Sequence, residues 1–108
     1  MKRVKRRYLA LQLESEALPS EREFMDAVWM SVTKLHGEVG ASMTGLSLIN
    51  FDAERKVYVI KCLLATLPQV RASIACVASV AGVAASVHVL AVSGTLKALF
   101  SNLHQVYT

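Results

Sequence analysis

The sequence predicts an α+β domain in which strands and helices follow one another in the order β-α-β-β-α-β-α. Two observations support this order: some segments alternate apolar and polar residues with a period of two, and others repeat apolar residues at helical spacing. Proline, glycine and capping residues separate the two kinds of segment. The chain has 108 residues, 54% of them hydrophobic, which is enough for one core. We therefore expect a basic arm over residues 1–7 and a single domain over residues 8–108.

The first part of the chain predicts a strand followed by a helix. Residues 4–14 alternate between apolar and polar side chains, as a half-buried strand requires. Ser20 followed three residues later by Glu23 is a capping box, which marks a helix start. Gly37 is expected to end this helix, because glycine readily adopts the left-handed conformation found after a helix. Three large side chains of the helix are expected to lie in the core, namely Met25, Trp29 and Met30.

The middle of the chain predicts a hairpin and a second helix. Residues 46–51 and 56–64 are two apolar runs joined by a short polar turn. Pro68 suits the first turn of a helix. Apolar residues then recur at helical spacing as far as position 81, where Gly82 is expected to end the helix.

The last part of the chain predicts a fourth strand and a third helix. Residues 83–92 are uncharged and rich in β-branched side chains, and Ser93 and Gly94 then interrupt the strand. The whole order is typical of the ferredoxin-like (RRM-like) split β-α-β fold, a four-stranded antiparallel sheet with two helices on one face, here with an extra C-terminal helix. Both sheet faces are apolar, so we expect the last helix, a second copy or another protein to cover part of the open face.

The charges are unevenly distributed along the chain. Residues 1–7 hold five Lys or Arg and no acid, whereas residues 8–54 hold all eight acids and only two basic residues. Residues 55–108 hold five basic residues and no acid, which gives a net charge of +4. Basic clusters attract polyanions, so nucleic acid is the first partner to consider. A basic arm that only aids solubility is the alternative.

The sequence offers no catalytic or metal site. Cys62 and Cys76 lack metal-ligand spacing and secretory context, so reduced thiols in a cytoplasmic protein are expected. His36, His88 and His104 also lack the paired spacing of a metal site, and no nucleophile motif is present.

A membrane-inserted protein is another alternative. Residues 72–96 contain no Asp, Glu, Lys or Arg and are long enough to cross a bilayer. However, the segment is rich in Ala and Ser, and Gly82 separates a helical pattern from a strand pattern. We therefore expect two buried elements and no membrane contact.

The candidate nucleic-acid contacts are mostly cations. Tyr8 and Tyr58 give only a poor platform for stacking bases. Backbone amides of Gly94 and Thr95 could hold a phosphate at the start of the last helix, although an ordinary turn and cap explains them as well. The expected phosphate contacts are Arg3, Lys5, Arg6, Arg7, Lys61, Arg71 and Lys97, and Lys56 is a further cation available to hold the RNA backbone.

Four short motifs in this order resemble one known family, ribonuclease P protein component 2, in its archaeal form. The acidic tail typical of eukaryotic members is not found here. The matching motifs are Arg6-Arg7-Tyr8-Leu9, His36-Gly37 with Gly40-Ala41, Lys61-Cys62, and Ser93-Gly94-Thr95-Leu96-Lys97.

The resemblance implies a non-catalytic subunit that binds the ribonuclease P RNA and supports 5′-end maturation of precursor tRNA. It implies a heterotetramer with ribonuclease P protein component 3 and only indirect contact with the precursor tRNA. The RNA with its Mg²⁺ ions would carry the chemistry, so this chain would bind no cofactor. The alternative is a ferredoxin-like dimer that senses a small molecule, which would have no need for a basic arm.

Overall fold

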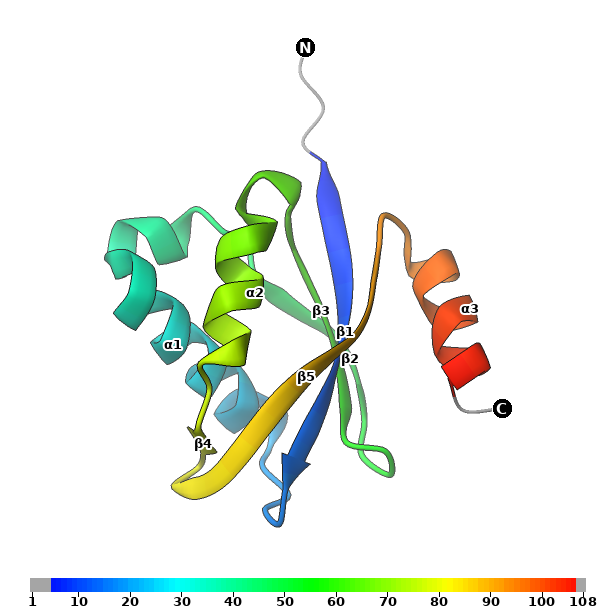
Figure 1. Cartoon of the computed structure of the whole chain (residues 1–108), viewed down its shortest axis with the longest axis horizontal. Helices are drawn as coiled ribbons and strands as arrows, with labels where there is room; N and C mark the ends of the chain where they lie inside the picture. Colours follow the sequence, from blue (N-terminus) through cyan, green and yellow to red (C-terminus); the bar gives the residue numbers. More distant parts are fainter. Residues whose placement is uncertain (1–4, 107–108) are drawn as a thin grey trace.

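The computed structural model describes residues 5–106, and one curled antiparallel sheet organises them (Figure 1). The spatial order of its strands is β2-β3-β1-β5-β4, and β1 lies at the centre. The strands are β1 (Arg6–Ser15), β2 (Ser47–Asp52), β3 (Val57–Leu63), β4 (Ser79–Val80) and β5 (Val83–Ser93).

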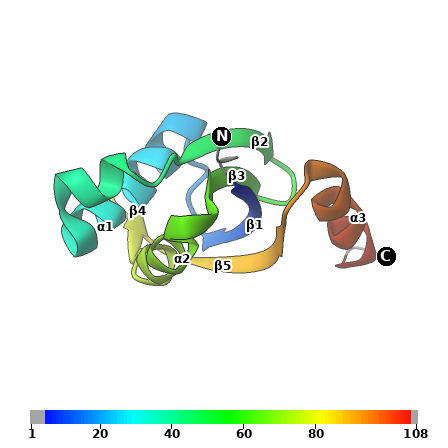
Figure 2. The same cartoon turned by 90° about the horizontal axis from the view of Figure 1, so that it is seen from above.

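Helices cover both faces of the sheet. The helices are α1 (Glu21–Ser42), α2 (Leu67–Ala75) and α3 (Leu96–Val106), and a short 3₁₀ turn, η1 (Leu64–Thr66), leads into α2. Seen from above, α1 and α2 lie on one side of the molecule and α3 lies at the other (Figure 2). Of the three candidates expected to cover part of the open face, the last helix is the one that packs there in this structure.

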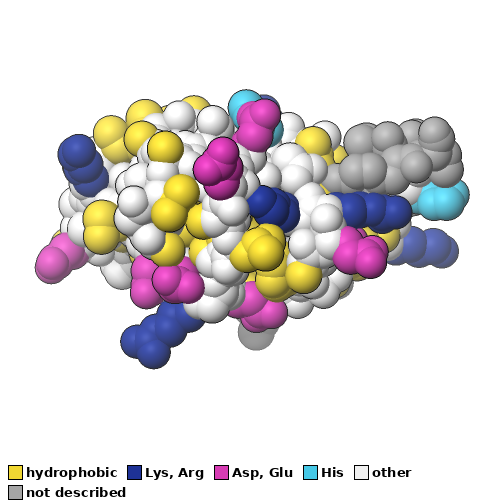
Figure 3. Space-filling model, turned by 90° about the horizontal axis from the view of Figure 1, so that it is seen from below, with side chains coloured by type: hydrophobic (Ala, Val, Ile, Leu, Met, Phe, Trp, Pro, Cys, Tyr) yellow, Lys and Arg dark blue, Asp and Glu magenta, His cyan; other side chains and the backbone are white. Residues whose placement is uncertain are grey.

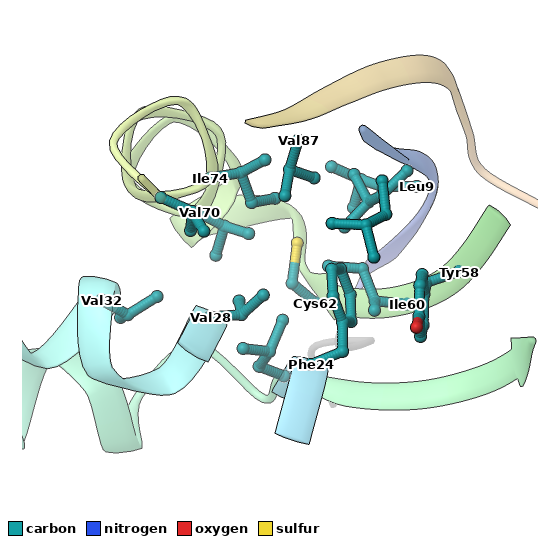
Figure 4. Packing of buried hydrophobic residues seen from close by; sticks show 14 of the residues in the cluster. Leu9, Phe24, Val28, Val32, Tyr58, Ile60, Cys62, Val70, Ile74 and Val87 are labelled. Carbon is teal, nitrogen blue, oxygen red and sulfur yellow. The ribbon is translucent and has the colours of Figure 1, made fainter. Parts of the chain in front are cut away.

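The central strand contributes to two separate cores because its side chains alternate between the faces. Leu9, Leu11 and Leu13 pack with α1 and α2, whereas Ala10 packs with Leu99 of α3. Figure 4 shows the larger core, in which Leu and Val side chains from the sheet meet those of α1 and α2. Burial of these apolar side chains supplies most of the stabilisation of such a small domain.

Three stacked aromatic rings extend the larger core towards the edge of the sheet. The ring centroids of Phe24 and Tyr58 are 3.7 Å apart, and those of Phe51 and Tyr58 are 4.3 Å apart. The Tyr58 hydroxyl donates a hydrogen bond to the carbonyl oxygen of Pro19 at 3.4 Å. Burial, with smaller contributions from Glu21 and Glu23, raises the pKa of Tyr58.

The first helix begins where predicted, and its regular geometry is interrupted at Gly37 as expected. Ser20 and Glu23 form the expected capping box, with hydrogen bonds of 3.0 and 3.1 Å. Gly37 (φ 76°, ψ 170°) has a non-helical backbone and positive φ, and a second helical segment, not predicted, follows this kink and ends at Ser42. Met30, expected in the core, lies on the outer surface with 71% of its area exposed.

The second helix is shorter than predicted, and the sheet has five strands where four were expected. The helix ends at Ala75, and β4 then pairs with the start of β5. Ala81 (φ 53°) and Gly82 (φ 78°) form the two-residue turn between them. Positive φ at both central residues is the geometry of a type I′ hairpin turn, which suits the twist of the two strands.

The uncharged segment 72–96 is thus divided among several short elements, and no helix among residues 5–106 is long and apolar enough to span a membrane.

The hairpin turn predicts opposite effects for two substitutions. Ala81→Asn should raise the free energy of unfolding by about 0.5–1 kcal/mol, because asparagine tolerates the left-handed conformation better than alanine. Gly82→Ala should lower it by about 1 kcal/mol through conformational strain alone, since no atom lies within 4 Å of the added Cβ. Urea denaturation measures both changes, and two changes of the same sign would contradict this turn geometry.

The buried thiol of Cys62 predicts a pH dependence of stability. Burial raises the pKa of Cys62 from 9.0 to about 11. The thiol has a higher pKa in the folded state than in the unfolded state. Its contribution to stability is therefore complete below pH 9 and is lost as the pH rises towards 11. The free energy of unfolding should therefore fall between pH 9 and pH 11, and it should fall less in Cys62→Ala. Equal losses in both proteins would refute this assignment.

Candidate nucleic-acid interface

The antiparallel pairing gathers basic residues at one end of the sheet. The start of β1 lies beside the ends of β3 and β5, with Arg6 opposite Leu63 and Tyr8 opposite both Lys61 and Ser93. We call this region the basic end. Its cations are Lys5, Arg6, Arg7, Lys61 and Lys97.

Two of these cations share the sheet face on which α3 packs. Residues directly opposite in an antiparallel pair point to the same face, so Lys61 lies beside Tyr8. Tyr8 is half-buried against the smaller core beneath α3. Arg6 is two residues from Tyr8 and points to the same face by alternation.

The Arg7 side chain lies between the start of β1 and the turn before α3. Its Nη1 donates a hydrogen bond to the carbonyl oxygen of Arg6 at 2.9 Å. The same nitrogen would lie 3.3 Å from a Cβ placed on Gly94. A guanidinium therefore lies next to the exposed backbone of the turn that opens α3.

The Ser93–Lys97 turn has the geometry of an ordinary helix cap. The Thr95 hydroxyl accepts a hydrogen bond from the backbone N–H of Ala98 at 3.2 Å, and the Ser93 hydroxyl accepts one from the N–H of Thr95 at 3.4 Å. The Thr95 side chain is thus engaged in capping. Any anion contact at this turn would come from backbone N–H groups of the first turn of α3 and from Lys97.

Not all the predicted contacts reach the basic end. Arg71 lies on α2 beside Val87 and Val89 of β5. Ser93 is four residues farther along that strand, about 13 Å away at the rise of a strand. Lys56 lies in the β2–β3 turn, and its Nζ donates to the carbonyl oxygen of Ser15. Arg3 lies outside the residues that the structure describes.

Acidic residues lie at the opposite end of the sheet. The end of β1, the β2–β3 turn and the start of α1 meet there, and they carry Glu14, Glu16, Glu21, Glu23, Asp52 and Glu54. Figure 3 views the molecule from this side, and Asp and Glu side chains are scattered over it beside some Lys and Arg. The charges are therefore separated along the strand direction, and the basic end suits a polyanion best.

The two tyrosines considered for base stacking do not lie together. Tyr58 is buried on the face covered by α1 and α2, whereas Tyr8 lies on the face covered by α3. The sequence pattern did not show which face each ring occupies, because apolar residues occupy both faces of β3. A stacking platform built on these two rings is therefore excluded.

The described residues form no cluster of three or more His, Cys, Asp or Glu side chains that could hold a metal ion. His88 Nε2 lies 2.8 Å from Glu14 Oε2, and both side chains are largely exposed. An exposed pair of this kind contributes little to stability. Within the described part of the chain, the interface thus consists of cations, backbone amides and one half-buried tyrosine.

Comparison with known proteins gives consistent matches. The protein-family model described as the Rpp14/Pop5 family matches residues 7–103. Ribonuclease P protein component 2 of Methanosarcina barkeri is 35% identical over 95 residues, which cover 88% of this chain and 69% of that protein. The proteins of the same name from Methanosarcina mazei and Pyrococcus furiosus are 36% and 33% identical, with 88% and 90% of this chain and 80% and 81% of theirs covered.

A solved structure supports the fold. A chain in the cryo-EM structure of yeast ribonuclease MRP matches with a TM-score of 0.72 at 15% identity, and the match covers 98% of this chain and 96% of that one. At this identity the likeness shows a shared α+β architecture.

Proposed function

The chain belongs to the Rpp14/Pop5 family, and we propose that it is a non-catalytic protein subunit of ribonuclease P that binds the catalytic RNA and supports 5′-end maturation of precursor tRNA. The names of the archaeal relatives support the archaeal form of this enzyme and a place in a ribonucleoprotein complex. The alternative of a small-molecule-sensing dimer gains no support from these relatives. A cytoplasmic location remains part of the proposal.

The basic end is the observation that carries this proposal. Its cations come from separate segments of the chain and meet only because β1 pairs with both β3 and β5. Such a cluster suits recognition of a folded RNA through its phosphates and shape. The chain would supply these contacts, while the RNA and its Mg²⁺ ions would supply the chemistry.

We also assign the domain to a variant of the ferredoxin-like fold. The four longer strands follow the order β2-β3-β1-β5, with α1 joining β1 to β2 and α2 joining β3 to the hairpin of β4 and β5. This arrangement corresponds to the split β-α-β pattern. The short strand β4 and the helix α3 are then additions to it.

A second surface suits a protein partner, and we propose ribonuclease P protein component 3 as its occupant, in a heterotetramer. A groove of about 620 Å³ lies between α1 and the segment 76–82, with exposed Met30 and Leu35 along its α1 side. Glu23, Asp26 and Lys34 also line it, so its net charge is negative and favours a partner that presents apolar and basic side chains. Large apolar patches on a small protein commonly mark such contacts.

A salt titration of binding to a ribonuclease P RNA tests the RNA-binding role. The double variant Lys61→Ala/Lys97→Ala should bind more weakly, and the slope of log affinity against log salt should become shallower by about 2, because each lost phosphate contact removes about 1. Arg22→Ala/Lys34→Ala removes the same charge from α1 and is the matched control. Equal slopes for the two variants would contradict the placement of the interface at the basic end.

Substitutions in the groove test the protein contact. Met30→Asp with Leu35→Asp should weaken binding to protein component 3 by at least tenfold, because two charges would replace buried apolar contacts. Leu18→Asp changes a residue that is 76% exposed and does not line the groove, so it is the control. Isothermal titration calorimetry measures the affinities, and unchanged binding by the double variant would exclude this surface.

A further inference from the structure

A separate hollow of about 320 Å³ lies on the α3 face of the sheet, between α3 and the edge formed by β2 and β3. Asn50 pairs with Val59 and Asp52 pairs with Val57, so all four side chains point to this face. Val57 and Val59 are buried and form an apolar floor with Leu103. Asn50 and Asp52 form a polar rim along the edge strand.

The α3 side of the hollow is aromatic. Phe100 lines it and has 42% of its area exposed, although its neighbour Leu99 is fully buried in the smaller core. His104 follows Phe100 by one helical turn and lines the same hollow. An exposed aromatic ring and buried valines therefore line one apolar hollow that has polar groups at one side.

These groups match the chemistry of a nucleobase. A flat heterocycle can stack on an aromatic ring and rest on apolar side chains, while its edge needs hydrogen-bond partners. The Asn50 amide can both donate and accept, and the Asp52 carboxylate only accepts. A carboxylate favours a base edge that presents adjacent N–H donors, which guanine does.

The rim is accessible to a ligand, although Asp52 already interacts with Arg55. Asp52 Oδ1 accepts a hydrogen bond from the Arg55 backbone N–H at 3.3 Å, and Asp52 Oδ2 lies 4.0 Å from Arg55 Nη1. Both side chains are about half exposed, so the remaining acceptor positions of the carboxylate are open to a ligand. Arg55 also lines the hollow, so its guanidinium could approach the phosphate of a bound nucleotide.

We propose that this hollow holds a single unpaired base of the RNA, with guanine preferred. The inference rests on the proposed function and extends it from phosphate contacts to the reading of one base. The hollow and the basic end lie on the same sheet face: Val59 is two residues from Lys61 along β3, and Phe100 is one turn from Lys97 along α3. An RNA held at the basic end by its phosphates could therefore place one splayed base in the hollow.

Binding of short RNA hairpins tests the proposal. Hairpins that differ only in one bulged nucleotide (G, A, C or U), together with a fully paired hairpin, should rank with the bulged G as the tightest ligand. Phe100→Ala should weaken binding of the bulged-G hairpin about 10- to 100-fold, because stacking on the ring is lost. The salt slope should not change, since no phosphate contact is removed. Leu18→Ala, at an exposed apolar side chain outside the hollow, is the control.

A second variant, Asp52→Asn, tests the base preference separately, because it does not remove an apolar contact from the hollow. It should remove the preference for G over A while leaving binding of the fully paired hairpin unchanged. If Phe100→Ala and Asp52→Asn bind all hairpins like the intact chain, while the Lys61→Ala/Lys97→Ala variant binds more weakly, the base-binding role fails and the RNA-binding function stands. If the intact chain shows no salt-dependent RNA binding, the proposed function itself fails, and this inference fails with it.

Discussion

The central position of β1 is the constraint on which the rest of the structure depends. This strand pairs with β3 on one side and β5 on the other, and its residues Leu9, Ala10 and Leu11 are completely buried. Because successive side chains point to opposite faces, one strand supplies apolar contacts to the α1 and α2 layer and to α3. A one-residue slip would exchange the two faces and disrupt both cores at once.

The same pairing determines where the charges lie. β1 begins with Arg6 and Arg7 and ends near Glu14 and Glu16, so its direction sets a basic end and an acidic end. Only the partners that reach the start of β1 can add cations to the basic end, and Lys61 of β3 does so. Under the proposed function, RNA contacts at the basic end and protein contacts along α1 would occupy different parts of a small surface.

Local sequence patterns correctly predicted those elements in which the local conformational preference and the tertiary packing favour the same structure. The alternation in β1 and the capping box of Ser20 and Glu23 are such cases, since burial and hydrogen bonding both favour the local conformation. The hairpin of β4 and β5 was missed because Val77 and Ala81 continue a helical spacing, and Ala81 is a poor signal for a turn that needs positive φ. The basic end was predictable as a set of cations, but its membership was not. Strand pairing places Lys61 beside Tyr8, whereas Arg71 lies on α2 beside Val87 and Val89.

The third helix changes what the sheet can do with RNA. In a sheet with an open face, rings on the central strands can stack bases. Here α3 covers that face through Leu99 and Leu103 and leaves Tyr8 half-buried beneath the helix. An apolar opening remains at the rim of this face, where Phe100 lies outside the buried positions of α3 and lines a hollow together with residues of β2. A helix that closes the second core thus moves any base contact from the centre of the sheet to its edge, where a polar strand provides the hydrogen-bonding groups.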